Sequence, residues 1–133
     1  MTNLEKYRSA LNEDVQGLLL TSRYSRMYAA EFDISEGYAI VSNKGARYFT
    51  DSRYIESAQK NLKGFEVIDF DGKLYDCLNA AIQDFGIETL GFEQGYLTVA
   101  ELNAFEEKLK AKFLPVQEKL DAFRAGLEAA LEA

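Results

Sequence analysis

The chain has 133 residues, close to the usual size of a single domain, so we expect one hydrophobic core. Its net charge of -7 is spread along the chain, which disfavours nucleic acid as a partner. Because the sequence contains no histidine, Ser-His and Cys-His nucleophile pairs and histidine-ligated metal sites are excluded for this chain.

The sequence shows no sign of a membrane or secretory segment. No apolar run approaches the roughly 20 residues that a membrane-spanning helix needs, and residues 1–6 do not form a charged-then-apolar signal. The single cysteine, Cys77, excludes an intramolecular disulfide and fits a reducing compartment. Cys77 is expected to be buried, because Leu74, Leu78 and Ile82 surround it at helical spacing. We therefore predict a cytoplasmic location and no membrane partner.

The first third of the chain predicts helix, strand and helix in turn. Residues 3–13 place apolar side chains on one helical face, with Thr2 or Asn3 available as the N-cap. Residues 15–21 are a short apolar run typical of a strand buried on both faces. A brief helix over 22–32 is expected to follow it.

A β-hairpin is the next predicted element. Residues 37–42 and 46–50 alternate as strands, and residues 43–45 form the turn between them. Gly45 is expected to supply the positive φ of a tight hairpin turn.

The second half continues the alternation of helices and strands. A helix capped by Asp51 or Ser52 is expected to end before Gly64, and Thr98 with Glu101 forms a capping box at the start of a later helix. Pro115 is expected to place the last strand at an edge or at its own beginning. The remaining predicted elements are strands at 65–70, 89–93 and 112–117 and a helix over 74–85. Together these elements predict an α/β fold: a mixed sheet of five to six parallel and antiparallel strands with helices on both faces.

Several segments resemble, in the same order, the amino-terminal domain of the creatinase/prolidase family. Residues 48–54 resemble the family's threonine-aspartate-x-arginine-tyrosine box, and residues 90–93 resemble its leucine-glycine-x-glutamate strand. Residues 14–22 are similar to its first strand. Residues 25–32 are similar to the next segment, although Ser25 replaces the usual asparagine. Arg124 is similar to the arginine that closes the domain, so the resemblance covers residues 14–124.

The resemblance implies a larger parent protein, a proline-specific metallopeptidase of the Xaa-Pro aminopeptidase or Xaa-Pro dipeptidase type. The family's second, pita-bread domain binds two divalent metal ions (Mn, Co or Zn), which activate water for hydrolysis. This catalytic domain is absent from the present chain, which is expected to bind no cofactor and to be inactive alone. Residues 1–124 are expected to form the domain and residues 125–133 a truncated interdomain helix or an artificial tail.

The same resemblance implies the partners of the domain. They are the missing C-terminal catalytic domain of the parent chain and a second copy of the chain in a homodimer. The domain would wall part of the active site, influence substrate access and contribute to dimerisation.

Asp51, Arg53 and Tyr54 form the candidate interface or structural motif. In one interpretation Asp51 caps the following helix, while Arg53 and Tyr54 fix the strand-to-helix junction. In the other, these side chains contact a neighbouring subunit or the catalytic domain. No catalytic, cofactor-binding or metal-binding residue is predicted in this chain.

A second hypothesis treats the chain as a free-standing α/β module for small-molecule binding or interaction. Tyr24, Tyr28, Phe32 and Tyr38 form an aromatic cluster that either packs in the core or lines a pocket near Tyr24 and Tyr38. A fold alone does not decide between this function and that of an accessory domain.

Overall fold

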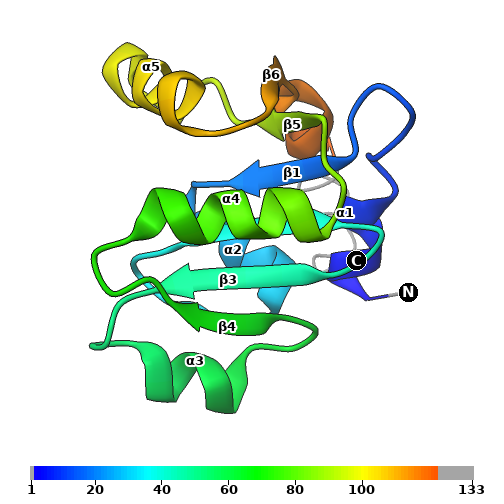
Figure 1. Ribbon diagram of the computed structural model, residues 1–133. Coiled ribbons are helices and arrows are strands. Elements are labelled where there is room, and N and C mark those ends of the chain that lie inside the picture. The colour runs from blue at the N-terminus through cyan, green and yellow to red at the C-terminus, as the bar shows by residue number, and fades with distance from the viewer. Residues whose placement is uncertain (1, 123–133) are drawn as a thin grey trace.

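The computed structural model of the chain describes residues 2–122, which form one six-stranded sheet covered by helices (Figure 1). The strands are β1 (Gly17–Leu20), β2 (Tyr38–Ser42), β3 (Ala46–Thr50), β4 (Glu66–Asp69), β5 (Thr89–Phe92) and β6 (Lys112–Pro115). The labelled helices are α1 (Asn3–Arg8), α2 (Arg23–Ala30), α3 (Ile55–Asn61), α4 (Leu74–Asp84) and α5 (Val99–Lys108), and residues 117–122 are also helical. This arrangement confirms the predicted mixed α/β fold.

The order of strands across the sheet is β4-β3-β2-β1-β5-β6. The pairs β1·β2 and β2·β3 are antiparallel, whereas β1·β5, β3·β4 and β5·β6 are parallel. All strands except β2 therefore run the same way, and Figure 1 shows the arrows of β1, β3 and β4 pointing to one side. We call that side, where these five strands end, the carboxyl edge.

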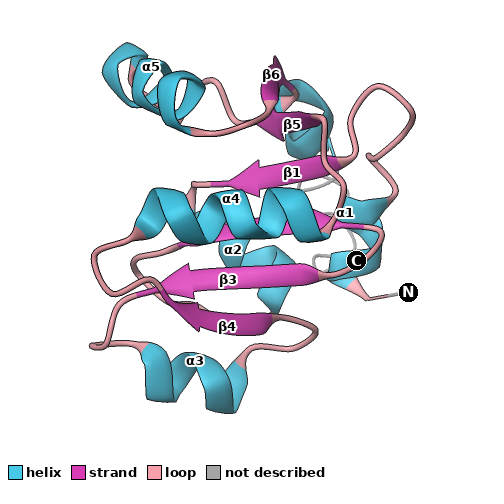
Figure 2. Cartoon of the chain, in the orientation of Figure 1, coloured by secondary structure: helices cyan, strands magenta, loops and turns pink. Residues whose placement is uncertain are grey.

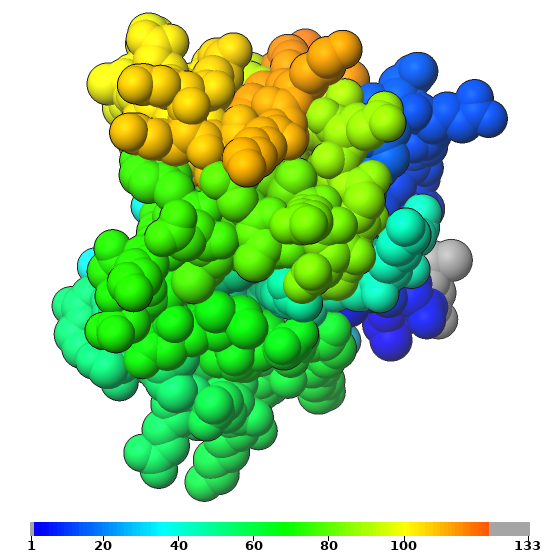
Figure 3. All heavy atoms as spheres, viewed as in Figure 1, coloured from blue at the N-terminus to red at the C-terminus, as the bar shows by residue number. Residues whose placement is uncertain are grey.

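The helices divide between the two faces of the sheet (Figure 2). Side chains alternate along β1, so Leu18 and Leu20 pack with residues of α1, α2 and α3, and Leu19 packs with residues of α4 and α5. In Figure 3, the side chains of α4 and α5 cover the face turned to the viewer. Because both faces are covered at the centre of the sheet, β1 reads as a continuous apolar run in the sequence, and all its residues are buried.

Two of the predicted caps are confirmed in detail. The Thr98 hydroxyl accepts a hydrogen bond from the backbone N–H of Glu101, whose carboxylate accepts from the N–H of Thr98. Thr2 and Glu5 form the same reciprocal pair at α1. The prediction for Pro115 is also confirmed, because it ends β6 at one edge of the sheet.

The positive φ predicted for Gly45 is wrong, although the predicted hairpin is confirmed. The hairpin forms, but Gly45 does not adopt a φ between +20° and +160°. A Cβ at this position would lie 2.7 Å from Cε1 of Phe85, whose ring packs against the turn. Glycine is required here by the close approach of a side chain and not by the turn conformation.

Other expected boundaries and burials also differ. The first helix ends at Arg8 and not near residue 13, because the side chain of Asn12 accepts hydrogen bonds from the backbone N–H groups of Asp14 and Val15 and favours a turn. Cys77 is half-buried and not fully buried. No helix among the described residues is both long enough and apolar enough to cross a bilayer.

Candidate functional site

The carboxyl edge of the sheet contains a hollow of about 340 Å³. It lies where β1, β3 and their following segments meet the start of β2, which is the side of an open α/β sheet where ligands usually bind. It is lined by Thr21, Arg26, Ser35, Glu36, Gly37, Tyr38, Thr50, Asp51, Phe70, Tyr96 and Glu101. We call this cavity the edge hollow.

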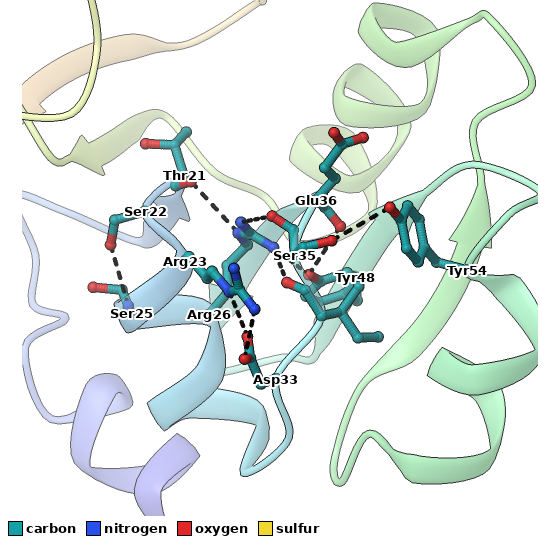
Figure 4. Close-up of polar contacts among 11 residues, drawn as sticks. Thr21, Ser22, Arg23, Ser25, Arg26, Asp33, Ser35, Glu36, Tyr48 and Tyr54 are labelled. Atoms are coloured by element: carbon teal, nitrogen blue, oxygen red, sulfur yellow. Dashed lines mark hydrogen bonds and ion pairs between the residues drawn. The ribbon is translucent and has the colours of Figure 1, made fainter.

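Arg26 organises one wall of the edge hollow from α2, and it is only 4% exposed (Figure 4). Its guanidinium donates hydrogen bonds to the carbonyl oxygens of Ile34 and Ser35, at 2.9 and 3.2 Å, and more weakly to that of Thr21, at 3.4 Å. It also donates to the hydroxyl of Tyr48 at 2.6 Å. Burial raises the pKa of that phenol, while the charge of Arg26 acts to lower it. The arginine therefore ties together three segments around the hollow.

Glu93, directly after β5, is fully buried and holds the turn between β1 and α2. One carboxylate oxygen accepts hydrogen bonds from the backbone N–H groups of Thr21 and Ser22, at 3.0 and 3.1 Å. The other accepts from the hydroxyls of Ser22 and Ser25, at 2.7 and 2.9 Å. Four donors thus satisfy the buried carboxylate, and no ion pair within residues 2–122 involves it.

Asp51, Arg53 and Tyr54 do lie together at the β3-to-α3 junction. Both carboxylate oxygens of Asp51 accept hydrogen bonds from Arg53, at 3.0 and 2.7 Å, and Arg53 also contacts the carboxylate of Glu36 at 2.7 Å. The guanidinium lies 5.1 Å from the centroid of the Tyr54 ring. The hydroxyls of Tyr54 and Ser35 are 3.3 Å apart. Arg53 remains 63% exposed in this cluster.

The expectation that Asp51 caps the helix is wrong. Helix α3 begins at Ile55, and its N-cap residue Tyr54 makes no side-chain capping bond. Asp51 instead accepts a hydrogen bond from the backbone N–H of Arg53 at 3.0 Å, because the residues between β3 and α3 form a turn. The hydrogen bonds from Arg53 hold the pKa of the Asp51 carboxyl below its usual value, and the same contacts raise the pKa of Arg53.

The expected aromatic cluster is divided by the sheet. Tyr28 and Phe32 pack on the face covered by α1, whereas Tyr38 packs on the face covered by α4. Tyr24 is 56% exposed and does not line the edge hollow. The pocket expected near Tyr24 and Tyr38 therefore involves only Tyr38.

The edge hollow presents several side chains that can bind a ligand. Among residues 2–122, no group of three or more cysteine, aspartate and glutamate side chains is placed to hold a metal ion. The hollow offers carboxylates, phenols and one buried guanidinium. Such groups orient a ligand by hydrogen bonds and charge.

Sequence reasoning missed the roles of Arg26 and Glu93. A signal for Glu93 was present, since a carboxylate directly after a buried strand is unusual and needs partners. Arg26 lies one helical turn after Ser22, on the side of α2 that also carries buried alanines. Apart from Thr21, the partners of Arg26 lie in the loop after α2 and in β3, and the sequence alone does not show that these segments lie beside it.

The fold and the edge hollow define a class of α/β domain with a mixed sheet and a polar cavity at its carboxyl edge. A family model described as the creatinase/prolidase N-terminal domain matches residues 4–125. The chain belongs to this family, as the resemblance of its motifs implied.

Among the matching relatives are two that are more than 30% identical to the chain. The uncharacterized peptidase YqhT of Bacillus subtilis (strain 168) is 34% identical over 123 residues, covering 91% of this chain and 35% of YqhT. The solved Xaa-Pro dipeptidase from Bacillus anthracis is 36% identical with a TM-score of 0.85, covering 92% of this chain and 35% of the dipeptidase. The chain therefore spans about a third of the length of these relatives.

A solved Xaa-Pro aminopeptidase structure, aminopeptidase P from Streptococcus thermophilus, shares the fold at lower identity. It is 22% identical with a TM-score of 0.80, and the match covers 92% of this chain and 95% of the solved chain. This likeness shows that the two chains share one fold.

Proposed function

We propose that this chain is the non-catalytic N-terminal domain of a larger proline-specific metallopeptidase of the Xaa-Pro aminopeptidase or dipeptidase type. The observation that carries the proposal is the match of residues 4–125 to the N-terminal domain family, together with coverage of only 35% of the Bacillus anthracis dipeptidase. Residues 1–124 would form the domain. The proposed end of the domain and the interdomain helix or tail at 125–133 lie outside the described residues.

In this proposal the two divalent metal ions are bound by another part of the parent protein. The described residues do not fit them, because they contain no metal-ligating group of three side chains and the sequence has no histidine. The chain would hydrolyse no Xaa-Pro peptide by itself. A cytoplasmic location remains a prediction.

The proposed roles are to wall the active site, to influence substrate access and to support a homodimer. The motif of Asp51, Arg53 and Tyr54 is the proposed contact with the catalytic domain or a neighbouring subunit. In its support, Arg53 and Glu36 are 63% and 61% exposed, yet Arg53 is held in place by two carboxylates and a tyrosine ring. A fixed and exposed guanidinium suits recognition at an interface, because little side-chain entropy is lost on binding.

A domain exchange tests this function. Residues 1–124 would replace the matching N-terminal third of the Bacillus anthracis dipeptidase, and the release of proline from Xaa-Pro dipeptides would be measured. The exchanged protein should hydrolyse these peptides better than a variant that lacks the N-terminal third. Hydrolysis by the isolated chain would contradict its inactivity, and a folded exchange no better than the deletion would contradict its role.

The interface is tested in the same exchanged protein. Arg53→Ala should lower activity or the fraction of dimer measured by light scattering. Arg23→Ala is the matched control, because Arg23 is similarly exposed and paired with Asp33. If both substitutions have equal effects, the Asp51, Arg53 and Tyr54 motif is not a specific interface.

The edge hollow favours a second candidate function, a free-standing small-molecule binding or interaction module. Its volume of about 340 Å³ lies at the lower end of the roughly 300–1,000 Å³ typical of ligand pockets. A thermal-shift screen of metabolites on the isolated chain tests this function. A concentration-dependent rise in Tm would support it, and a uniformly flat response would count against it.

A further inference from the structure

The edge hollow has an unusual lining for so small a cavity. Three carboxylates and three aromatic side chains line it, with Glu36, Asp51 and Glu101 as the acids and Tyr38, Phe70 and Tyr96 as the aromatic residues. The hydroxyls of Thr21 and Thr50, two further lining residues, are buried and have no hydrogen-bond partner among the described residues. The hydrogen-bonding capacity of these two hydroxyls is therefore unused within residues 2–122.

The negative charges at the edge hollow are incompletely balanced. Asp51 and Glu36 share one guanidinium, that of Arg53. Glu101 accepts a hydrogen bond from the backbone N–H of Thr98, and no ion pair within residues 2–122 involves it. The carboxylate of Glu101 is thus a negative charge without a cation in the described part of the chain.

The phenol of Tyr38, which lines the edge hollow, is influenced by the charges of both Glu101 and Arg26. Burial raises the pKa of its phenol, and the charge of Glu101 raises it further. Arg26 lowers this pKa, but less than Glu101 raises it. Glu101 therefore acts on Tyr38 more strongly than Arg26 does, although Arg26 lines the same cavity.

From this geometry we infer that the edge hollow binds a compact organic cation, with a protonated amine beside Glu101 and the rings of Tyr38 and Tyr96. Aromatic faces attract cations through their quadrupole, and a carboxylate adds a charge-assisted hydrogen bond. Anionic ligands are disfavoured, because Glu101 would repel them. The inference does not depend on the proposed peptidase function, since the isolated chain carries every residue involved.

An amine of this kind has two sources, a free small amine or the N-terminal ammonium of a short peptide. Both share the charged group that Glu101 and the tyrosine rings would recognise. Binding can therefore be tested with one probe of each source.

The experiment is an NMR titration of the ¹⁵N-labelled isolated chain with propylammonium chloride, with sodium acetate as the anionic comparison. Saturable shifts are expected at the backbone amides of Gly37, Asp51 and Tyr96, which line the hollow. Acetate should give no such shifts. Added salt should weaken amine binding, because part of the attraction is between charges that solvent reaches.

Glu101→Gln tests the charge without removing the helix cap, because glutamine also completes a capping box. Amine binding should weaken about five-fold, the effect of losing one partly solvated ion pair. Glu107→Gln is the matched control, since Glu107 is exposed on the same helix and does not line the hollow. Its affinity should be unchanged.

Ala-Pro and N-acetyl-Ala-Pro distinguish the two sources. Binding of Ala-Pro but not of its acetylated form, or binding of propylammonium alone, would each support an ammonium site and assign its source. The inference is overturned if neither amine gives saturable shifts, if acetate or the acetylated peptide binds as well, or if Glu101→Gln and Glu107→Gln behave alike. Each of these results leaves the test by domain exchange unaffected.

Discussion

Replacing Glu93 should reveal how much the turn between β1 and α2 depends on one buried carboxylate. Glu93→Ala removes the acceptor of two backbone N–H groups, those of Thr21 and Ser22, and of two serine hydroxyls. Each buried N–H left without a partner costs roughly 1–3 kcal/mol, whereas the hydroxyls can rotate toward other acceptors. The two N–H groups together give a loss of about 4 kcal/mol in the free energy of unfolding.

Glu93→Gln separates the charge from the hydrogen bonds. The amide oxygen can still accept from the two backbone N–H groups, and the amide N–H₂ can donate to the hydroxyls of Ser22 and Ser25. Only the extra strength of bonds to a charged acceptor is lost, which predicts a smaller cost of about 2 kcal/mol. The ranking of the two variants is therefore the more specific prediction.

Urea unfolding followed by circular dichroism measures both losses, provided that the slope with denaturant stays constant. Glu88→Gln is the matched control, because Glu88 is an exposed glutamate just before β5 and should change stability by less than about 0.5 kcal/mol. A loss below about 1 kcal/mol for Glu93→Ala would refute the reasoning, because even one orphaned buried N–H should cost that much. Equal losses for the alanine and glutamine variants would refute the separation of charge from geometry.

Three further predictions concern other parts of the fold. Gly45→Ala should lower the free energy of unfolding by about 1–3 kcal/mol, because the added methyl group clashes with the Phe85 ring. Adding Phe85→Leu should recover part of that loss in urea unfolding. Additive losses for the two substitutions would contradict the contact. The hydrogen bond from Arg23 lowers the pKa of Asp33 below 3.8, so this pair stabilises the fold above that pH and loses its effect as the pH falls through the folded pKa. Asp33→Asn should therefore flatten the fall in Tm below about pH 4, and an unchanged slope would contradict the pairing. Arg26→Lys should lower the free energy of unfolding by about 3 kcal/mol in the same urea assay, because one ammonium cannot replace hydrogen bonds to three carbonyls and a hydroxyl. A loss under about 1 kcal/mol would contradict that account.

Local patterns in the sequence predicted the elements of the fold well. The apolar run at β1 predicted a strand buried on both faces, and all four of its residues are buried. The reciprocal pattern of Thr98 and Glu101 predicted the start of α5, because both hydrogen bonds form within three residues. Such features depend on neighbours along the chain, so the sequence contains nearly all the information needed.

Features that depend on distant contacts were not predictable in the same way. Gly45 was read from turn statistics, but its role is set by Phe85, which is 40 positions later and packs from another element. Asp51 had the right residue type for a cap, but the turn after β3 delays α3 to Ile55. In both cases tertiary packing overrode a local preference that was correct in kind.

The same limit explains why the candidate site was only partly found. Asp51, Arg53 and Tyr54 lie within four positions of one another, so the sequence alone indicates that they form one motif. Arg26 and Glu93 instead have partners that only the strand order brings close to them. Thr21 and Ser22, which Glu93 holds, come 71 and more positions before it, and only the parallel pairing of β1 with β5 places them together. Without the strand order, the sequence does not show that Glu93 lies close to Thr21 and Ser22 in space.

The turn between β1 and α2 connects the hydrogen bonds of Glu93 with the edge hollow. Glu93 fixes the backbone of Thr21 and Ser22, and α2 begins directly afterwards with Arg26 in its first turns. Thr21 and Arg26 both line the edge hollow, so any movement of this turn displaces one of its walls. The hydrogen bonds that the buried carboxylate of Glu93 accepts therefore serve a positional purpose, because they fix the turn that carries these two lining residues.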